Sequence, residues 1–279
     1  MSVYNRSGTL IADKTPTTTT AKPLNGLKLS LLGDSISSYR GYVPEGNHYY
    51  YNGSKAGVSS VDQMWWKVLC TETGMEPLVI DAWSGTGVTA LDGESRADRT
   101  PMSDNSRCSR LHSGSTLPNV ILIAGGVNDY TYATGNKNEP LAWNGHTNPV
   151  AGNSFTEAYA VMIKQLHTNY PKAIVVALST WFTMRGTDTG DMFVHSVSAT
   201  NHTYSQADYN IAIESVANHL HVPYVRVDDI GINRSNMYPT YAEDSDTHPA
   251  HVNSKGQALM GKYLASVLPI IAGSFAASL

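Results

Sequence analysis

The sequence predicts an α/β domain in which helices cover both faces of a mainly parallel, five-stranded sheet. Short, continuous apolar segments alternate along the chain with longer amphipathic segments. Continuous apolar strands are typical of parallel sheets, which are buried on both faces. The chain has 279 residues, 41% of them hydrophobic, which is enough for one such domain with a sizeable core.

The strands and helices are expected to alternate along the chain. The expected strands are residues 27–32, 78–82, 120–124, 173–178 and 223–227, of which the third is a continuous Val-Ile-Leu-Ile-Ala run. The expected helices are residues 61–73, 154–169, 205–219 and 254–268. Glu157 follows Ser154 by three residues, and Asp208 follows Ser205 at the same spacing, which is the pattern of a capped helix start.

Residues 1–24 precede the domain and are expected to form a disordered or extended arm. Thr17 to Thr20 form a run of threonines, with Pro16 before it and Pro23 shortly after it. Little in this segment is apolar, so its composition is typical of a linker. The domain itself is therefore expected to span residues 25–279.

The charge of the chain excludes several classes of partner. The net charge is -4, and the sequence has no basic patch of the kind that binds a nucleic acid. It also lacks a Lys/Arg cluster that would indicate binding to a membrane surface. No apolar run is long enough to span a bilayer, and no secretory signal is visible at the N-terminus. Only 15% of residues are charged, a composition typical of an extracellular or particle-borne protein.

Four long segments follow predicted strands and are expected to surround the carboxyl edge of the sheet. They are residues 39–60, 93–118, 132–153 and 182–204. Long loops inside a compact domain are usually functional, and these are rich in Tyr, Trp, Asn, Ser and His. Such residues suit a polar ligand with stacking faces, such as a sugar. The alternative interpretation is that they are ordinary surface loops.

The candidate nucleophile is Ser35, in the sequence Leu-Leu-Gly-Asp-Ser-Ile-Ser at residues 31–37. The Gly33-Asp34-Ser35 turn ends the first predicted strand, and carboxyl ends of strands in open α/β sheets collect ligands and reactive groups. Gly33 permits a sharp bend that leaves the serine hydroxyl exposed. The same residues are also common at ordinary turns and helix starts.

Two further segments follow predicted strands and offer hydrogen-bond donors at the same edge. Gly85 lies in Trp-Ser-Gly-Thr after the second strand, and Asn128 lies in Gly-Gly-Val-Asn-Asp after the third. Ester hydrolysis requires donors aimed at the oxyanion, each worth about 3 kcal/mol. The backbone N–H groups of Ser35 and Gly85 and the carboxamide of Asn128 are candidates for an oxyanion hole, although Gly and Asn are also common turn residues.

A fourth segment, residues 244–256, offers acid and base partners just before the last helix. Serine chemistry needs an imidazole to take the hydroxyl proton and a carboxylate to orient it. The four segments together resemble the SGNH (GDSL-type) hydrolase superfamily from about residue 27 to residue 268. This resemblance implies a flavodoxin-like, three-layer α/β/α fold, ester hydrolysis without a cofactor, and roles for Ser35, Gly85 and Asn128 as argued above.

The fourth segment departs from the family pattern, which has Asp, two residues, His, and a Gly five residues after the His. Counting back from Gly256 selects His251 as the base, but His248 stands where the family has its Asp. Counting from the His-Pro pair selects His248 instead. We favour His251, with Asp246 as the carboxylate for either histidine, and a Ser-His dyad as a variant. A metal site at Asp246, His248 and His251 is the less favoured alternative.

The function expected from these features is a serine esterase that removes small acyl groups, in particular O-acetyl groups from a carbohydrate. The esterase reaction rests on the Ser, Gly and Asn segments, and the carbohydrate rests on the aromatic loops and on the resemblance. An acyltransferase or thioesterase would use the same serine. The alternative from another class is a catalytically impaired carbohydrate-binding module, which the Thr-rich arm tethers to a larger assembly such as a cell surface or a phage tail.

Overall fold

The computed structural model describes residues 2–4, 10–13, 22–91, 98–132, 154–183, 204–242 and 249–276. A five-stranded, all-parallel sheet of order β4-β3-β5-β6-β7 forms the centre of the domain. Its strands are β3 (Lys28–Gly33), β4 (Glu76–Ala82), β5 (Val120–Ala124), β6 (Ile174–Leu178) and β7 (Tyr224–Val225). The first strand of this sheet lies between the second and the third, which is the flavodoxin-like order. The predicted fold class is therefore confirmed.

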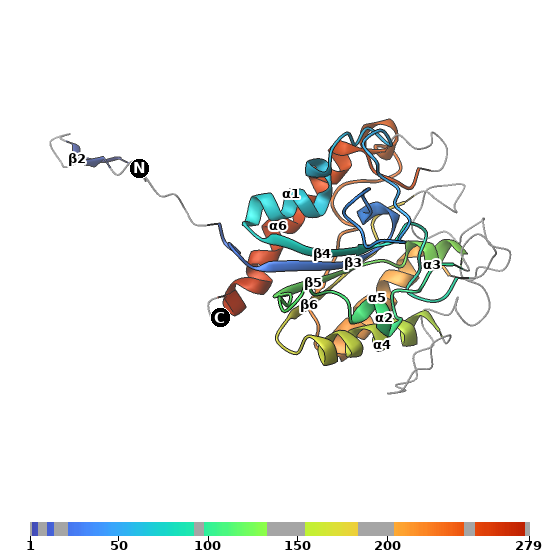
Figure 1. Ribbon diagram of the computed structural model, residues 1–279. Helices are drawn as coiled ribbons and strands as arrows, with labels where there is room; N and C mark the ends of the chain where they lie inside the picture. Colours follow the sequence, from blue (N-terminus) through green and yellow to red (C-terminus); the bar gives the residue numbers. More distant parts are fainter. Residues whose placement is uncertain are drawn as a thin grey trace.

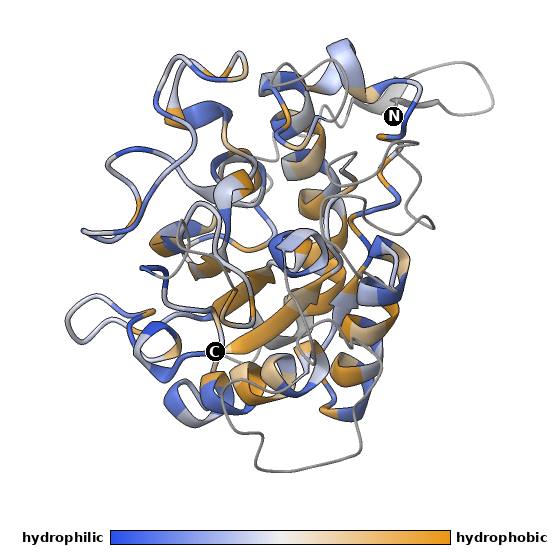
Figure 2. Ribbon diagram, turned by 90° about the vertical axis from the view of Figure 1, so that its right-hand side faces the viewer, coloured by the Kyte–Doolittle hydropathy of each residue, from blue (hydrophilic) through white to orange (hydrophobic). Residues whose placement is uncertain are grey.

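Helices cover both faces of the sheet (Figure 1). On one face lie α1 (Trp65–Thr73) and α6 (Ser254–Ala276), and on the other α2 (Asn105–Cys108), α4 (Phe155–Asn169) and α5 (Gln206–His219). Alternate strand residues point to opposite faces, so Leu31 and Leu122 pack with the first pair of helices, whereas Leu32 and Ile123 pack with the other set. Figure 2 shows the apolar strands enclosed between these layers.

Both predicted helix caps are present. The hydroxyl of Ser154 accepts from the amide of Glu157, and Ser205 makes the same contact with Asp208. The predicted helix over residues 61–73 is instead divided into a short 3-10 turn, η2 (Val61–Gln63), and α1. Met64 between them is extended, because the first amide of α1 donates to the side chain of Gln257 rather than continuing the preceding turn.

The last two predicted elements differ in length from the observed ones. The strand predicted over residues 223–227 is reduced to β7, because the amides of Val227 and Asp228 donate to the hydroxyl of Ser179 instead of to a neighbouring strand. The helix predicted to end at residue 268 continues through Pro269 to residue 276. Proline removes only one backbone donor, and the buried side chain of Ala272 continues the packed face of α6 beyond it.

The N-terminal segment forms a separate two-stranded antiparallel sheet of β1 (Ser2–Tyr4) and β2 (Leu10–Asp13). The chain packs against the domain from about Leu24, which is 1% exposed and donates its backbone amide to the carbonyl of Thr73. The boundary after residue 24 remains a prediction. None of the helices in the described ranges is long and apolar enough to cross a bilayer.

Candidate active site

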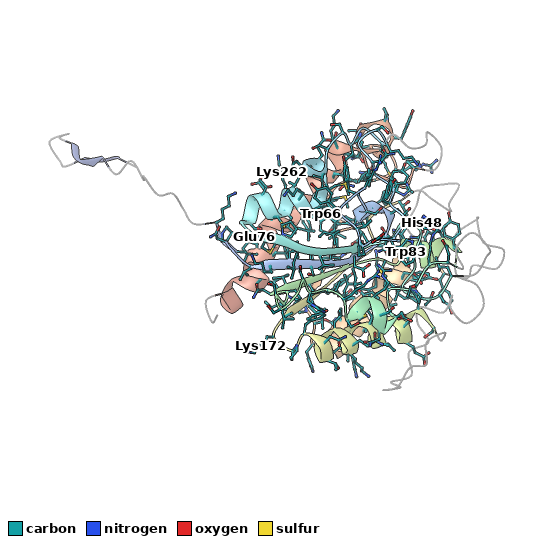
Figure 3. All side chains as sticks on the ribbon, in the orientation of Figure 1. His48, Trp66, Glu76, Trp83, Lys172 and Lys262 are labelled. Atoms are coloured by element: carbon teal, nitrogen blue, oxygen red, sulfur yellow. The ribbon has the colours of Figure 1, made fainter. Side chains whose placement is uncertain are left out.

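The three segments that carry Ser35, Gly85 and Asn128 begin at paired residues at the carboxyl ends of neighbouring strands. Gly33, the last residue of β3, pairs with Ala82 at the end of β4 and with Ala124 at the end of β5. Figure 3 shows His48 and Trp83 at this carboxyl edge, with Glu76 at the opposite end of the sheet. Because the strand ends are in register, residues far apart in the sequence meet beyond them.

Ser35 begins a tight 3-10 turn, η1 (Ser35–Ser37), directly after β3. The carboxylate of Asp34 accepts the amide of Ile36 at 2.9 Å and so caps this turn. A Cβ at Gly33 would lie 2.9 Å from the Cβ of Ser37, so a side chain at Gly33 would collide with the returning turn. The turn leaves Ser35 half-buried, at the edge of the sheet.

The core supports this turn from behind. The indole N–H of Trp65 donates to the hydroxyl of Ser37 at 3.1 Å, and that of Trp66 donates to the Ser37 carbonyl at 3.0 Å. The side-chain amide of Gln257, in α6, donates from Nε2 to the carbonyl of Ile36 at 3.1 Å. All three supporting side chains are fully buried, so α1 and α6 hold the backbone on which Ser35 lies.

Within the ranges that the structure describes, His251 is the histidine that lies against Ser35. Its Nε2 lies 2.8 Å from the Ser35 Oγ, within hydrogen-bond distance, and the residue is 6% exposed. The neighbouring backbone is held firmly, since Val252 pairs with Ala242 and the amide of Asn253 donates to the carbonyl of Tyr241 at 2.7 Å. A serine hydroxyl and an imidazole at this distance have the geometry that a nucleophile and its general base require.

The spacing from His251 to Gly256 has a steric cause. A Cβ at Gly256 would lie 2.6 Å from the Cβ of Val252, so only glycine fits at this position. The side chain of Asn253 accepts the amides of Lys255 and Gly256 at 3.0 and 3.1 Å, which caps the start of α6. The sequence count from Gly256 back to His251 therefore spans a tight turn in which the backbone of Gly256 packs against Val252.

Asp246 and His248 lie outside the described residues, between positions 242 and 249. Their predicted roles, as carboxylate and as alternative base, therefore remain predictions. Within the described ranges, no group of three or more His, Cys, Asp or Glu side chains is arranged to hold a metal ion.

Asn128 and the segment of Gly85 are joined directly. Asn128 lies near the start of α3 (Val127–Tyr132), is 5% exposed, and donates from Nδ2 to the carbonyl of Thr86 at 2.9 Å. Gly85, one residue before Thr86, has a φ of +79°, which side chains disfavour. The hydrogen bond thus brings the segments after β4 and β5, which carry two of the candidate oxyanion donors, to neighbouring positions.

Asp129 supports this arrangement and was not singled out from the sequence. Its carboxylate accepts the amides of Val88 and Thr89, each at 2.8 Å, and the Thr89 hydroxyl at 2.6 Å. Burial raises the pKa of this carboxyl to about 6, although these hydrogen bonds oppose the shift. The only sequence signal was its position directly after Asn128, and the residue anchors the chain that continues from Gly85.

A second supporting group that the sequence did not reveal is a buried ion pair. Arg107, fully buried, donates from Nη2 to the carboxylate of Asp81 at 3.0 Å and from Nη1 to the hydroxyl of Thr86 at 3.2 Å. Arg110 donates to the other carboxylate oxygen of Asp81 at 2.6 Å. The available signal was an acidic residue in the otherwise apolar predicted strand 78–82, whereas nothing in the sequence distinguished Arg107.

Burial also affects the acidic residue next to the candidate nucleophile. It raises the pKa of the Asp34 carboxyl from 3.8 to about 7, and the nearby carboxylate of Asp129 acts in the same direction. The hydrogen bond from the Ile36 amide and the guanidinium of Arg107 partly offset this rise. The edge of the sheet therefore holds two carboxyl groups in a poorly solvated environment.

Solved structures with the same fold were found by comparison. A protein from Bacteroides ovatus described as a GDSL-like lipase is 19% identical, with a TM-score of 0.61, covering 88% of this chain and 98% of that one. The carbohydrate acetylesterase Est24 from Sinorhizobium meliloti is 12% identical, with a TM-score of 0.56, covering 88% and 99%. A family two carbohydrate esterase from Clostridium thermocellum, in complex with cellohexaose, is 18% identical, with a TM-score of 0.57, covering 96% and 68%.

Among curated proteins, none matches this sequence significantly. A family model described as GDSL-like Lipase/Acylhydrolase matches residues 27–204, which is more than half of the chain. The matched region begins at the first predicted strand and includes the segments of Ser35, Gly85 and Asn128, so the resemblance drawn from those segments is confirmed. The chain belongs to the GDSL-like lipase/acylhydrolase family, within the SGNH hydrolase superfamily.

Proposed function

We propose that this protein is a serine esterase that hydrolyses small acyl esters, in particular O-acetyl groups on a carbohydrate. The observation that carries the proposal is the 2.8 Å contact between Ser35 Oγ and His251 Nε2 at the carboxyl edge of the sheet. An imidazole at this distance is suited to take the hydroxyl proton as the oxygen attacks.

In the proposed reaction, Ser35 Oγ attacks the ester carbonyl carbon while His251 Nε2 accepts the proton. The tetrahedral intermediate collapses to an acyl-serine, and His251 returns the proton to the departing alcohol. Water then attacks the acyl-serine, with the same imidazole as base, and releases the acid. The sequence-based candidate for the carboxylate that orients His251 remains Asp246.

The proposed oxyanion hole consists of the backbone N–H groups of Ser35 and Gly85 and the carboxamide of Asn128. A primary amide has two N–H donors. One of those on Asn128 bonds to Thr86, and the other is assigned to the oxyanion. Donors that are held in place before the reaction stabilise the developing charge without reorganisation.

A carbohydrate substrate is supported by the residues that surround this edge and by similar structures. The Trp83 ring lies 6.2 Å from the imidazole of His48, and His48 Nε2 pairs with the carboxylate of Asp98 at 2.8 Å. The side chains of His48 and Asp98 are more than half exposed, and Trp83 is half-buried beside His48, so polar groups for sugar hydroxyls lie next to an aromatic ring. Two of the similar structures are described as carbohydrate esterases.

The alternative, a catalytically impaired carbohydrate-binding module, is less favoured. A binding module does not require a serine hydroxyl within hydrogen-bond distance of a buried histidine. The pairing of Ser35 with His251 across 216 sequence positions therefore favours an enzyme.

The test is hydrolysis of p-nitrophenyl acetate, and acetate release from an acetylated polysaccharide, by the wild type and three variants. We expect Ser35→Ala and His251→Ala to lose activity and His248→Ala to retain it. Equal activity in the wild type and Ser35→Ala would overturn the assignment of the nucleophile. Activity on p-nitrophenyl acetate without acetate release would support the esterase and contradict the carbohydrate substrate, whereas no activity on either would favour the binding module.

A further inference from the structure

Two consecutive tyrosines enclose the imidazole of His251. The ring of Tyr50 lies parallel to it, with the ring centroids 3.5 Å apart and an angle of 9° between the planes. The ring of Tyr51 meets it edge-on, at 6.4 Å and 85°. Both tyrosines come from the segment after β3, about 200 positions before His251 in the sequence, so this contact depends on the tertiary fold.

The backbone of these tyrosines is tied to the turn that carries Ser35. The hydroxyl of Ser38 donates to the carbonyl of Ser35 at 3.0 Å and accepts the amide of Tyr50 at 2.8 Å. The amide of Tyr51 donates to the Ser38 carbonyl at 3.2 Å. Ser38 therefore sets the position of Tyr50 relative to the nucleophile.

The same pair is tied to the segment that carries His251. The hydroxyl of Tyr51, a fully buried residue, donates to the carbonyl of Val252 at 2.7 Å. The rings of Tyr50 and Tyr51 pack edge-to-face at 4.9 Å and 83°. Tyr50 is thus held between the turn of Ser35 and the backbone next to His251, and the Lys55 ammonium lies 5.1 Å from the centre of its ring.

We propose that Tyr50 is a positioning residue that keeps the His251 imidazole in the plane that directs Nε2 at Ser35 Oγ. This inference rests on the proposed esterase function. The outer torsion of a histidine side chain is broad, so its ring rotates readily unless neighbours restrict it. With the Tyr50 face 3.5 Å away, rotation out of the parallel plane drives an edge of the imidazole into that ring.

The stack is also suited to the charge that the reaction creates. When His251 takes the proton of Ser35 it becomes a cation, and the face of a tyrosine ring attracts a cation. The ring, and not the hydroxyl, of Tyr50 supplies this contact. Phenylalanine at position 50 is therefore expected to keep the ring contact with His251, whereas alanine removes it.

The test compares Tyr50→Phe, Tyr50→Ala and Tyr49→Ala in steady-state hydrolysis of p-nitrophenyl acetate, with Tm measured for each. Tyr49 is the matched control, because it is the neighbouring tyrosine, is 43% exposed, and is not part of the ring contacts among the described residues that surround His251. We expect Tyr50→Ala to lower kcat about 10- to 100-fold with little change in KM, since a displaced catalytic group costs about this much. The kcat of Tyr50→Phe and of Tyr49→Ala is expected to stay within about threefold of the wild-type value, because neither variant displaces the catalytic group.

Three results would overturn the proposal. They are an unchanged kcat in Tyr50→Ala, a rise in KM alone, which would make Tyr50 a substrate contact, and an equal loss of kcat in Tyr50→Phe. If Tyr50→Ala does not fold, Tyr50→Phe still tests the proposal, because a loss of kcat in that variant would contradict the role of the ring.

A second readout separates this inference from the proposed function. Diethyl pyrocarbonate modifies accessible imidazoles, and peptide mass spectrometry measures the rate at His251 whether or not the protein is active. We expect faster modification in Tyr50→Ala than in the wild type and Tyr50→Phe. An inactive wild type would contradict the esterase function, while equal modification rates at His251 in all three proteins would contradict the role of Tyr50.

Discussion

The side-chain amide of Asn128 donates a 2.9 Å hydrogen bond to the carbonyl oxygen of Thr86. This bond joins the segment after β5 to the segment after β4, one residue from Gly85. It also sets the direction of the second N–H of the amide, which is the condition for a preorganised donor. The relationship links the packing of two strand ends to the proposed oxyanion hole.

Replacing Asn128 is therefore expected to affect catalysis more than stability. We expect Asn128→Ala to lower kcat for p-nitrophenyl acetate about 100-fold, the effect of one oxyanion donor. Its free energy of unfolding should fall by about 1 kcal/mol, the usual contribution of one hydrogen bond. The matched control is Asn119→Ala, because Asn119 accepts the Lys28 amide at the opposite end of β3. A similar loss of kcat in both variants would contradict the role of Asn128.

The two carboxylates of β4 are expected to differ greatly in their contribution to stability. Asp81 is fully buried and pairs with Arg107 and Arg110, whereas the Glu76 side chain is 59% exposed and pairs with Lys28. We expect Asp81→Asn to lower the free energy of unfolding by about 3–5 kcal/mol, because it leaves a buried guanidinium without its counter-charge. Glu76→Gln should cost less than about 1 kcal/mol. Urea denaturation measures both, and equal effects would show that the buried network contributes no more to stability than the exposed pair of Glu76 and Lys28.

Two glycines of α6 provide a test of helix packing. A Cβ at Gly261 would lie 2.5 Å from the carbonyl oxygen of Trp65, in α1, whereas a Cβ at Gly273 meets nothing within 4 Å. We expect Gly261→Ala to destabilise the protein by about 1–3 kcal/mol through overpacking. Gly273→Ala should instead stabilise it by up to about 1 kcal/mol, the difference in helix propensity. Thermal denaturation of the two variants checks this, and a higher Tm in Gly261→Ala would contradict the close approach of α1 and α6.

The raised pKa of Asp34 predicts a dependence of stability on pH. Because burial raises this pKa from 3.8 to about 7, the folded state binds the proton more tightly than the unfolded state does. The resulting stabilisation is complete below about pH 4 and is lost as the pH rises through about 7.

Asparagine at position 34 removes this titration. We expect the free energy of unfolding of the wild type, relative to Asp34→Asn, to fall by a few kcal/mol between pH 5 and pH 8, since one pKa unit corresponds to about 1.4 kcal/mol. Urea denaturation of both proteins at a series of pH values measures this difference. A difference that stays constant across the range would show that the carboxyl titrates near its ordinary value.

Much of the fold follows from local patterns. Continuous apolar segments predicted the five parallel strands, since such segments are stable only when both faces are covered. The capping pairs at Ser154 and Ser205 predicted where α4 and α5 begin, because a cap depends on residues three positions apart. Element ends were predicted less well where long-range contacts intervene, as at Trp65, whose amide donates to Gln257, 192 positions away.

The sequence by itself determined the class of the fold and placed Ser35, Gly85 and Asn128 at one edge, because the carboxyl ends of parallel strands meet there. Only the tertiary structure decided that His251 approaches Ser35, that Tyr50 stacks on that imidazole, and that Arg107 lies beneath the turns. These contacts join segments that no local periodicity relates. Their geometry depends on how the layers and loops pack, which a linear pattern does not encode.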